Sequence, residues 1–134
     1  MMGPIYLDTS AVLRAVLESG VSPDIEDRIA GAAALITSRL SLVESARAMH
    51  RVRSTASVSE RQLADAQRNL GQLWARCDVW ELTEAVCRLA CEVAPREKLR
   101  TLDALHLATY LHARERIPGL ELLTADARMR KAAD

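Results

Sequence analysis

Four acidic side chains of the sequence could together bind a metal ion: Asp8, Glu44, Asp103 and Asp126. If these carboxylates meet without partners, they repel one another and raise each other's pKa values. A hard divalent cation such as Mg²⁺ or Mn²⁺ relieves that repulsion, because it prefers oxygen ligands and leaves room for water and phosphate. The four acids therefore predict a metal site that activates water for attack on a phosphate ester.

The first stretch of the chain would position one of these acids. Residues 4–7 are an apolar run rich in strand formers that stops at Asp8, and an apolar helical pattern covers residues 11–17. Thr9 and Ser10 are good helix N-caps, because their hydroxyls accept free backbone N–H groups. The carboxyl ends of strands bind ligands in open α/β sheets, so Asp8 is expected at the functional edge. The helix is apolar on nearly all sides, which predicts burial in the core or cover by a partner.

The rest of the chain alternates between strand-like runs and helical patterns. Three further strands are predicted at 34–37, 79–82 and 120–124. Helices are predicted at 23–29, at 42–53 with Ser38 or Ser41 as cap, at 60–76, between Thr83 and Pro95, at 102–115 with Thr101 as cap, and after Asp126, with a polar turn at 54–59. This order is typical of an α/β fold with helices on both faces of a parallel sheet. Such a sheet would bring all four carboxylates to one edge.

Length and composition bound the class of protein. A chain of 134 residues is one domain by length, and 49% hydrophobic with 27% charged residues argues against disorder. The net charge is zero, which counts weakly against a nucleic-acid binder, although a basic groove beside an acidic site would sum to the same value. Two Trp, two Tyr and no Phe argue against binding single strands mainly by stacking.

The sequence predicts a cytoplasmic protein with no membrane partner. Its apolar runs are all shorter than the roughly 20 residues needed to cross a bilayer. The amino terminus has no basic segment followed by a signal-peptide core. The three cysteines are odd in number and lack a C-x-x-C spacing, so they are interpreted as reduced thiols.

Four motifs resemble the signatures of the PIN domain: IYLDTSAVL at 5–13, the pair Ser41 and Glu44, RTLDALHLA at 100–108, and LLTAD at 122–126. The chain is most similar to the VapC-type ribonuclease toxins of type II toxin–antitoxin pairs. The resemblance covers almost the whole chain and implies one PIN-like α/β domain over 1–134, with a mainly parallel sheet of four or five short strands flanked by helices on both faces. It also implies a Mg²⁺- or Mn²⁺-dependent endoribonuclease with an RNA substrate, a cognate antitoxin and a homodimeric state.

The resemblance implies a role for each acid. Asp8 and Asp103 match the principal metal ligands of the family, which bind the ion directly or through water. Glu44 and Asp126 would complete the acidic site and hold metal-bound water or a second ion. All four are therefore expected to be catalytic.

The same resemblance implies supporting groups around the acids. Thr9 or Ser10, and Thr124, would orient the carboxylates, since hydrogen bonds to ligands fix their geometry. Arg100, three residues before Asp103, is the best candidate for a phosphate contact.

Three further side chains near the acids have less specific interpretations. Arg47 and Arg51 lie three and seven residues beyond Glu44 on the same helical face, where they could meet RNA phosphates, although exposed helix arginines usually face water. His106, one helical turn beyond Asp103, is interpreted as a partly buried, hydrogen-bonded core residue and not as a catalytic group.

Each acid also has a purely structural interpretation. Asp8 could be a turn residue, Asp126 a helix N-cap, and Glu44 and Asp103 ordinary first-turn acids favoured by the helix dipole. These interpretations explain each position but not the coincidence of all four. The alternative function is a catalytically silent PIN-fold module that binds RNA or protein. The D-x-D-x-T, G-x-S-x-G and G-x-G-x-x-G patterns of other enzyme classes are absent from the sequence.

Overall fold

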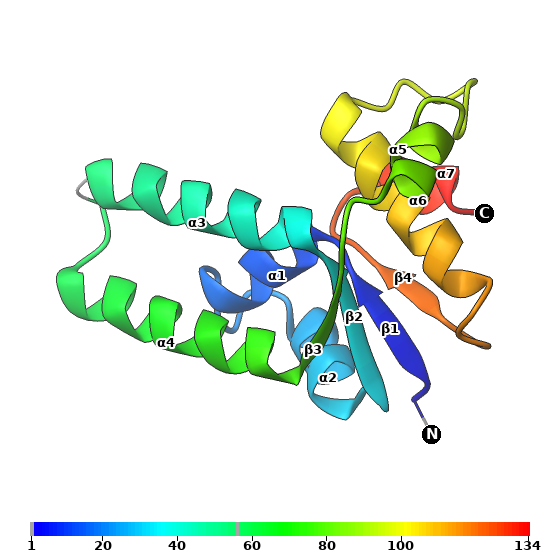
Figure 1. The fold of residues 1–134 in the computed structure, drawn as a ribbon. Helices are drawn as coiled ribbons and strands as arrows, with labels where there is room; N and C mark the ends of the chain where they lie inside the picture. Colours follow the sequence, from blue (N-terminus) through cyan, green and yellow to red (C-terminus); the bar gives the residue numbers. More distant parts are fainter. Residues whose placement is uncertain (1, 56) are drawn as a thin grey trace.

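A parallel sheet forms the centre of the fold. The computed structural model describes residues 2–55 and 57–134, and within these ranges the chain forms four strands. They are β1 (Pro4–Leu7), β2 (Ala34–Ser38), β3 (Cys77–Trp80) and β4 (Glu121–Leu123). Their order is β3-β2-β1-β4 and every neighbouring pair is parallel (Figure 1). All four strands therefore end at the same edge, and the predicted α/β fold is confirmed.

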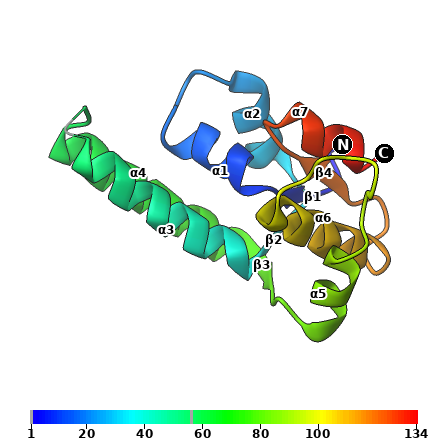
Figure 2. The same cartoon turned by 90° about the horizontal axis from the view of Figure 1, so that it is seen from above.

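Helices cover both faces of the sheet. The helices of the described ranges are α1 (Thr9–Val16), α2 (Pro23–Gly31), α3 (Arg39–Ser54), α4 (Glu60–Arg76), α5 (Glu84–Ala90), α6 (Thr101–Arg114) and α7 (Ala127–Ala132). Helices α1 to α4 lie on one side of the strands and α5 to α7 on the other (Figures 1 and 2). The chain thus encloses two separate cores, one on each side of the sheet.

Successive residues of β1 face opposite cores, as the two-residue period of a strand requires. Ile5 and Leu7 pack with buried residues of α1 to α4, among them Val12 and Leu63. Tyr6 points the other way and packs with Leu107 of α6. The strand that delivers Asp8 is therefore fixed from both sides.

Core packing explains the apolar surface of α1. Ala11 and Val12 are fully buried, and Ala15 and Val16 are partly buried against the same core. Of the two interpretations offered for this helix, burial in the core accounts for most of its apolar side chains.

Hydroxyl caps start three of the helices. Ser38, and not Ser41, caps α3 by accepting a hydrogen bond from the Leu40 N–H at 3.0 Å. Ser59 and Gln62 form a capping box at the start of α4, and the side chain of Thr83 caps α5 as predicted. Residue 56, inside the predicted turn at 54–59, lies outside the described residues.

The predicted caps Thr9, Ser10 and Thr101 are wrong. Helices α1 and α6 begin at Thr9 and Thr101 themselves, and their N-cap residues, Asp8 and Arg100, make no side-chain cap bond. The hydroxyls of Thr9 and Ser10 are instead bonded to carboxylates at the edge of the sheet. The carboxylate bonded by Thr9 is 35 residues away, whereas Ser10 bonds to Asp8 two residues before it and also contacts the distant Thr124 hydroxyl.

Two other predicted boundaries are wrong. Strand β3 begins two residues before the predicted strand at 79–82, because Cys77 is already extended where it follows α4 and pairs with β2. Helix α5 ends at Ala90 and does not continue to Pro95. Proline disfavours helical backbone in the residue before it, and Ala94 takes a φ of 43°.

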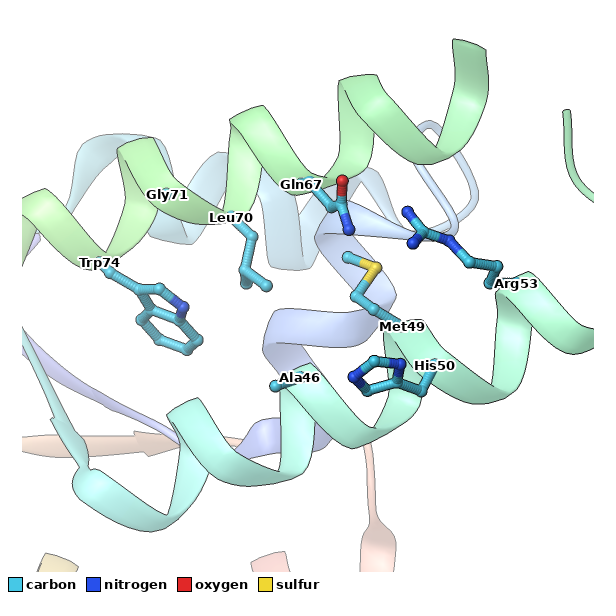
Figure 3. Close-up of a pocket in the computed structure, with 8 residues that line it drawn as sticks. All are labelled: Ala46, Met49, His50, Arg53, Gln67, Leu70, Gly71 and Trp74. Carbon is cyan, nitrogen blue, oxygen red and sulfur yellow. The ribbon is translucent and has the colours of Figure 1, made fainter. Parts of the chain in front are cut away.

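Helices α3 and α4 run side by side as an arm that extends away from the sheet (Figures 1 and 2). Leu70 and Trp74 of α4 point towards α3, and Met49 of α3 points back towards α4 (Figure 3). These side chains line a hollow of about 290 Å³ between the two helices. None of the described helices combines the length and apolar character that a membrane span requires.

Candidate active site

Asp8 is held rigidly at the carboxyl end of β1. Its backbone N–H donates to the carbonyl of Leu123 at 3.1 Å, and its residue is only 4% exposed. The hydroxyls of Ser10 and Thr124 both donate to Asp8 Oδ2 at 2.7 Å, and the two hydroxyls are 3.1 Å apart. Both donors engage one oxygen, so the carboxylate has a fixed orientation. Its other oxygen, Oδ1, lies 3.8 Å from His106 Nε2.

Glu44 reaches the same place from the first half of α3. Its Oε1 accepts a hydrogen bond from Thr9 Oγ1 at 2.7 Å and lies 2.6 Å from His106 Nε2. Burial alone would raise the pKa of Glu44, but the hydrogen bonds from His106 and Thr9, helped by the positive charge of Arg51, outweigh burial and lower the pKa. Glu44 is therefore anionic at neutral pH.

His106, from the second turn of α6, lies against both of these acids. It is 1% exposed, and its Nδ1 lies 2.9 Å from the hydroxyl of Tyr6. Burial, together with the charge of Asp8, raises the pKa of Tyr6 well above its usual value, so the phenol keeps its proton. Because the carboxylate of Glu44 can only accept, we assign the proton of the ring to Nε2, and Nδ1 then accepts from the hydroxyl of Tyr6.

Asp103 lies in the first turn of α6, among the other acids. Burial raises the pKa of Asp103, and the negative charges of Asp8, Asp126 and Glu44 raise it further against the opposing effect of His106. Asp8, Asp126 and Glu44 therefore lie near enough to Asp103 for their charges to affect it, although the four acids come from separate parts of the chain.

Asp126 has two roles at the start of α7. Its Oδ1 accepts the Arg128 N–H at 2.9 Å, which makes it the N-cap, and its own N–H donates to Thr124 Oγ1 at 3.0 Å. Asp126 also lines a hollow of about 650 Å³ together with Glu44 and Asp103. The structural interpretation of this residue and the functional one are thus compatible.

The hollow lies beside the carboxyl edge of the sheet and combines both signs of charge. Arg100, Thr101, Leu102 and Arg128 complete its wall beside the three acids. Asp8 is buried and is not part of the wall. Its charge nevertheless raises the pKa of Asp103, and its Oδ1 lies 3.8 Å from His106 Nε2. The structure thus places three of the predicted acids on the wall and the fourth behind it.

The donor chemistry of this site fits a hydrated divalent cation. In the described part of the chain, no group of three or more His, Cys, Asp or Glu side chains is placed to ligate one ion. Mg²⁺, however, is usually bound through only one or two carboxylates and keeps several waters. The acidic donors on the wall, Glu44, Asp103 and Asp126, are all carboxylates, whose hard oxygens suit such an ion.

The comparisons with known proteins identify the family. The family model of the PIN domain matches residues 5–134. The chain belongs to the PIN-domain family. Within it, the chain is similar to ribonuclease VapC35 of Mycobacterium tuberculosis, with 35% identity over 132 residues, 97% of this chain and 90% of that protein. The resemblance of the sequence motifs to VapC-type PIN domains is therefore confirmed.

Two solved structures share the PIN-domain fold at low sequence identity. VapC20 of Mycobacterium tuberculosis, described as a toxin that cleaves the sarcin–ricin loop, has a TM-score of 0.65 at 16% identity, covering 96% of this chain and 94% of that chain. A toxin–antitoxin complex from Klebsiella pneumoniae has a TM-score of 0.62 at 20% identity, covering 91% of this chain and 86% of that chain.

The arginines of this PIN domain lie at different distances from the acids. Arg100 lines the hollow, and the charge of Arg51 lowers the pKa of Glu44. Arg47 is exposed on α3 and does not line the hollow. Arg128 does line it and was not predicted, although its place two residues after Asp126 is a signal that the sequence offered.

His106 is the second residue of this PIN-domain site for which no functional role was predicted. The prediction that it is a hydrogen-bonded core residue is confirmed, but the ring is fully buried and not partly buried as predicted. Its partners, however, are a phenol of the core and Glu44 of the predicted site, 62 residues away in the sequence. No local pattern identifies such partners; only the one-turn spacing from Asp103 pointed to the site.

Proposed function

We propose that the chain is a metal-dependent endoribonuclease, the toxin of a toxin–antitoxin system, which hydrolyses RNA phosphodiester bonds. Membership of the PIN family and similarity to a named VapC ribonuclease support the ribonuclease class. The finer proposal is a site built from Asp8, Glu44, Asp103 and Asp126 that uses Mg²⁺ or Mn²⁺. The observation that carries it is the placement of Glu44, Asp103 and Asp126 on the wall of one hollow, with buried Asp8 against His106 behind that wall.

Each acid has a distinct task in this proposal. Asp8 and Asp103 would hold the ion, directly or through water, and Glu44 and Asp126 would complete its surroundings. A bound Mg²⁺ or Mn²⁺ supplies charge neutralisation and a more acidic water for attack on phosphorus. Hydrolysis adds that water across one P–O bond of the RNA backbone.

The side chains around the acids would orient ligand and substrate. Ser10 and Thr124 hold Asp8 by one oxygen, and Thr9 does the same for Glu44. Hydrogen bonds of this kind are commonly worth 10- to 100-fold in metal affinity or activity.

Arginines would supply the contacts to RNA. Arg100 and Arg128 on the wall of the hollow can pair with the phosphates that flank the cleaved bond. Arg51 is a candidate for a more distant phosphate, through its position near Glu44. Arg47, which is exposed on the same helix and does not line the hollow, has less support.

The partners and the setting of the protein are also part of the proposal. We expect one PIN domain over residues 1–134, a homodimer, a cytoplasmic location and inhibition by a cognate antitoxin. The similarity to a chain of a toxin–antitoxin complex supports the antitoxin partner. Light scattering of the isolated chain, and of the chain co-expressed with an adjacent small reading frame, would test the two assemblies.

The alternative is a catalytically silent module that keeps the fold to bind RNA or protein. A module of that kind has no need to gather mutually repelling carboxylates around a half-buried Asp103. The intact acids therefore favour the enzyme.

Substitution of Asp103 tests the enzyme against the silent module. Asp103→Asn keeps the shape of the side chain and removes its charge. We expect cleavage of a generic RNA with Mn²⁺ to fall by about 100-fold or more, together with Mn²⁺ binding and growth arrest on expression. The circular dichroism spectrum should be unchanged, because the position is only half-buried.

Asp27→Asn is the matched control. Asp27 is exposed on α2 and takes no part in the acidic hollow, so this variant should cleave like the wild type. Retained cleavage in folded Asp103→Asn, or equal cleavage by the wild type with the metal chelated, would contradict the proposal.

A further inference from the structure

A row of buried hydrogen bonds links the core behind the sheet to the acidic hollow. The Tyr6 hydroxyl lies 2.9 Å from His106 Nδ1, and His106 Nε2 lies 2.6 Å from Glu44 Oε1. Tyr6 and His106 are 0% and 1% exposed, whereas the side chain of Glu44 is 25% exposed at the hollow. The row therefore runs from a sealed interior to the surface where substrate would bind.

Both ring nitrogens of His106 are used in this row. A buried polar ring is costly unless each of its polar atoms is paired, and an apolar side chain would fill a core position of α6 at lower cost. Leu107, the next residue, is such a side chain. We therefore attribute the presence of an imidazole at this position to the hydrogen bond that its Nε2 makes with Glu44.

The hydrogen bonds at Glu44 show how His106 acts on this carboxylate. Thr9 and His106 both bond to the same oxygen, Oε1, and no hydrogen bond found among the described residues engages Oε2. A glutamate on a helix has several free torsions, and repulsion from Asp8 and Asp103 would turn an unrestrained carboxylate out to solvent. Two fixed donors hold it in the hollow with one oxygen left for a ligand.

We propose that His106, itself fixed by Tyr6, is a positioning residue that holds Glu44 ready to bind the cation. The inference rests on the proposed metal-dependent cleavage. His106 touches neither ion nor RNA in this account; it acts only through Glu44.

Two tyrosines of the same core provide a matched test. Tyr6→Phe removes the hydroxyl that bonds His106 Nδ1. Tyr110→Phe removes a buried hydroxyl whose bond goes to the carbonyl of Leu120 at 3.3 Å, and the two tyrosine rings lie 5.9 Å apart. Both variants lose one phenol hydroxyl from the same core, but only Tyr6→Phe breaks the row.

The readouts are the Mn²⁺ affinity measured by calorimetric titration and RNA cleavage as a function of Mn²⁺ concentration. We expect Tyr6→Phe to raise the Mn²⁺ concentration for half-maximal cleavage by about 10-fold, and Tyr110→Phe to leave it unchanged. A merely structural role would lower the maximal rate with the folded fraction and would not move this concentration.

Substitution of His106 itself gives a rescue test. His106→Leu should raise the half-maximal Mn²⁺ concentration by about 10- to 100-fold. His106→Gln should recover part of that loss, because the glutamine amide reaches about as far as Nε2 and can donate to Glu44. Tyr6→Phe decides the question if His106→Leu does not fold.

The outcomes separate the two proposals. Wild type that does not cleave with Mn²⁺ would overturn the proposed function and this inference with it. If the wild type is active and Tyr6→Phe has the same half-maximal Mn²⁺ concentration, the inference alone is overturned.

Discussion

Asp103 is the acid that shows most clearly how gathering these carboxylates lowers the stability of the metal-free fold. Burial and the neighbouring carboxylates raise the pKa of Asp103, so the metal-free folded state binds its proton more tightly than the unfolded chain does. The carboxylate therefore destabilises the metal-free fold at any pH above this raised pKa. The penalty disappears as the pH falls through it. The charge that the proposed function requires at Asp103 therefore lowers the stability of the metal-free protein.

Asp103→Asn is accordingly predicted to raise the melting temperature of the metal-free protein at pH 7. The neutral amide removes the repulsion from Asp8, Asp126 and Glu44. The gain over wild type should shrink as the pH is lowered, since wild-type Asp103 then becomes protonated. Thermal unfolding from pH 7 to pH 4 in the presence of a chelator measures the difference. A variant less stable than wild type at pH 7 would contradict this account of the site.

The same pKa shift sets the pH dependence of metal binding. A carboxylate must lose its proton before it can bind a cation, so protons and Mn²⁺ compete for Asp103. The Mn²⁺ concentration for half-maximal cleavage should rise as the pH falls. The rise should begin at a higher pH than it would for an aspartate with the usual pKa of about 3.9. A concentration that stays constant down to that value would contradict the prediction.

At the scale of single elements, helix α7 combines structure with chemistry at one residue. Asp126 caps the helix through Oδ1, and the same residue lines the acidic hollow. A cap needs a hydrogen-bond acceptor, whereas a metal site needs a negative charge. The two roles can therefore be separated by substitution.

Asp126→Asn should keep the cap and lose the charge, because asparagine and aspartate cap helices about equally well. We expect wild-type stability with cleavage reduced by about 10-fold or more. Asp126→Ala should lose cleavage to the same extent and also about 1 kcal/mol of unfolding free energy. Chemical denaturation and RNA cleavage of both variants provide the measurements. Full activity in Asp126→Asn would leave the residue as a cap alone.

Individual elements also show how far the sequence predicts the fold. Helix α4 has its predicted bounds, Glu60–Arg76, because the capping box at Ser59 and an amphipathic pattern both act locally. The hydroxyls of Thr9 and Ser10 could not be assigned in the same way. Their partners, Glu44 and Thr124, are 35 and 114 residues away, so capping propensity gave the wrong expectation.

At the scale of the whole molecule, the parallel topology accounts for the position of the acids. Each of β1, β2 and β4 ends at the same edge, and the starts of α3, α6 and α7 bring acids to it (Figure 1). This gathering followed from the order of strands and helices in the sequence. The burial of Asp8, and the contacts of His106 and Arg128, depend on side-chain packing between distant segments and could not be predicted.

The zero net charge of the chain makes RNA binding depend on local arginines. Arg100→Ala and Arg128→Ala, each in an inactive Asp103→Asn background, should lower the slope of log affinity against log salt by about 0.7 for a single strand. Arg96→Ala is the control, since Arg96 is exposed in the same loop and does not line the hollow. Equal slopes in all three variants would contradict the proposed phosphate contacts.

Calorimetric titration of the protein with Mn²⁺ tests the central claim most directly. The wild type, Asp8→Asn and Asp103→Asn should be compared at pH 7. The account predicts that the wild type binds Mn²⁺ and that each substitution weakens binding by at least about 10-fold, although the two residues lie in β1–α1 and α6. Wild type that binds no Mn²⁺, or either variant binding it as tightly as wild type, would contradict a single metal site shared by these acids.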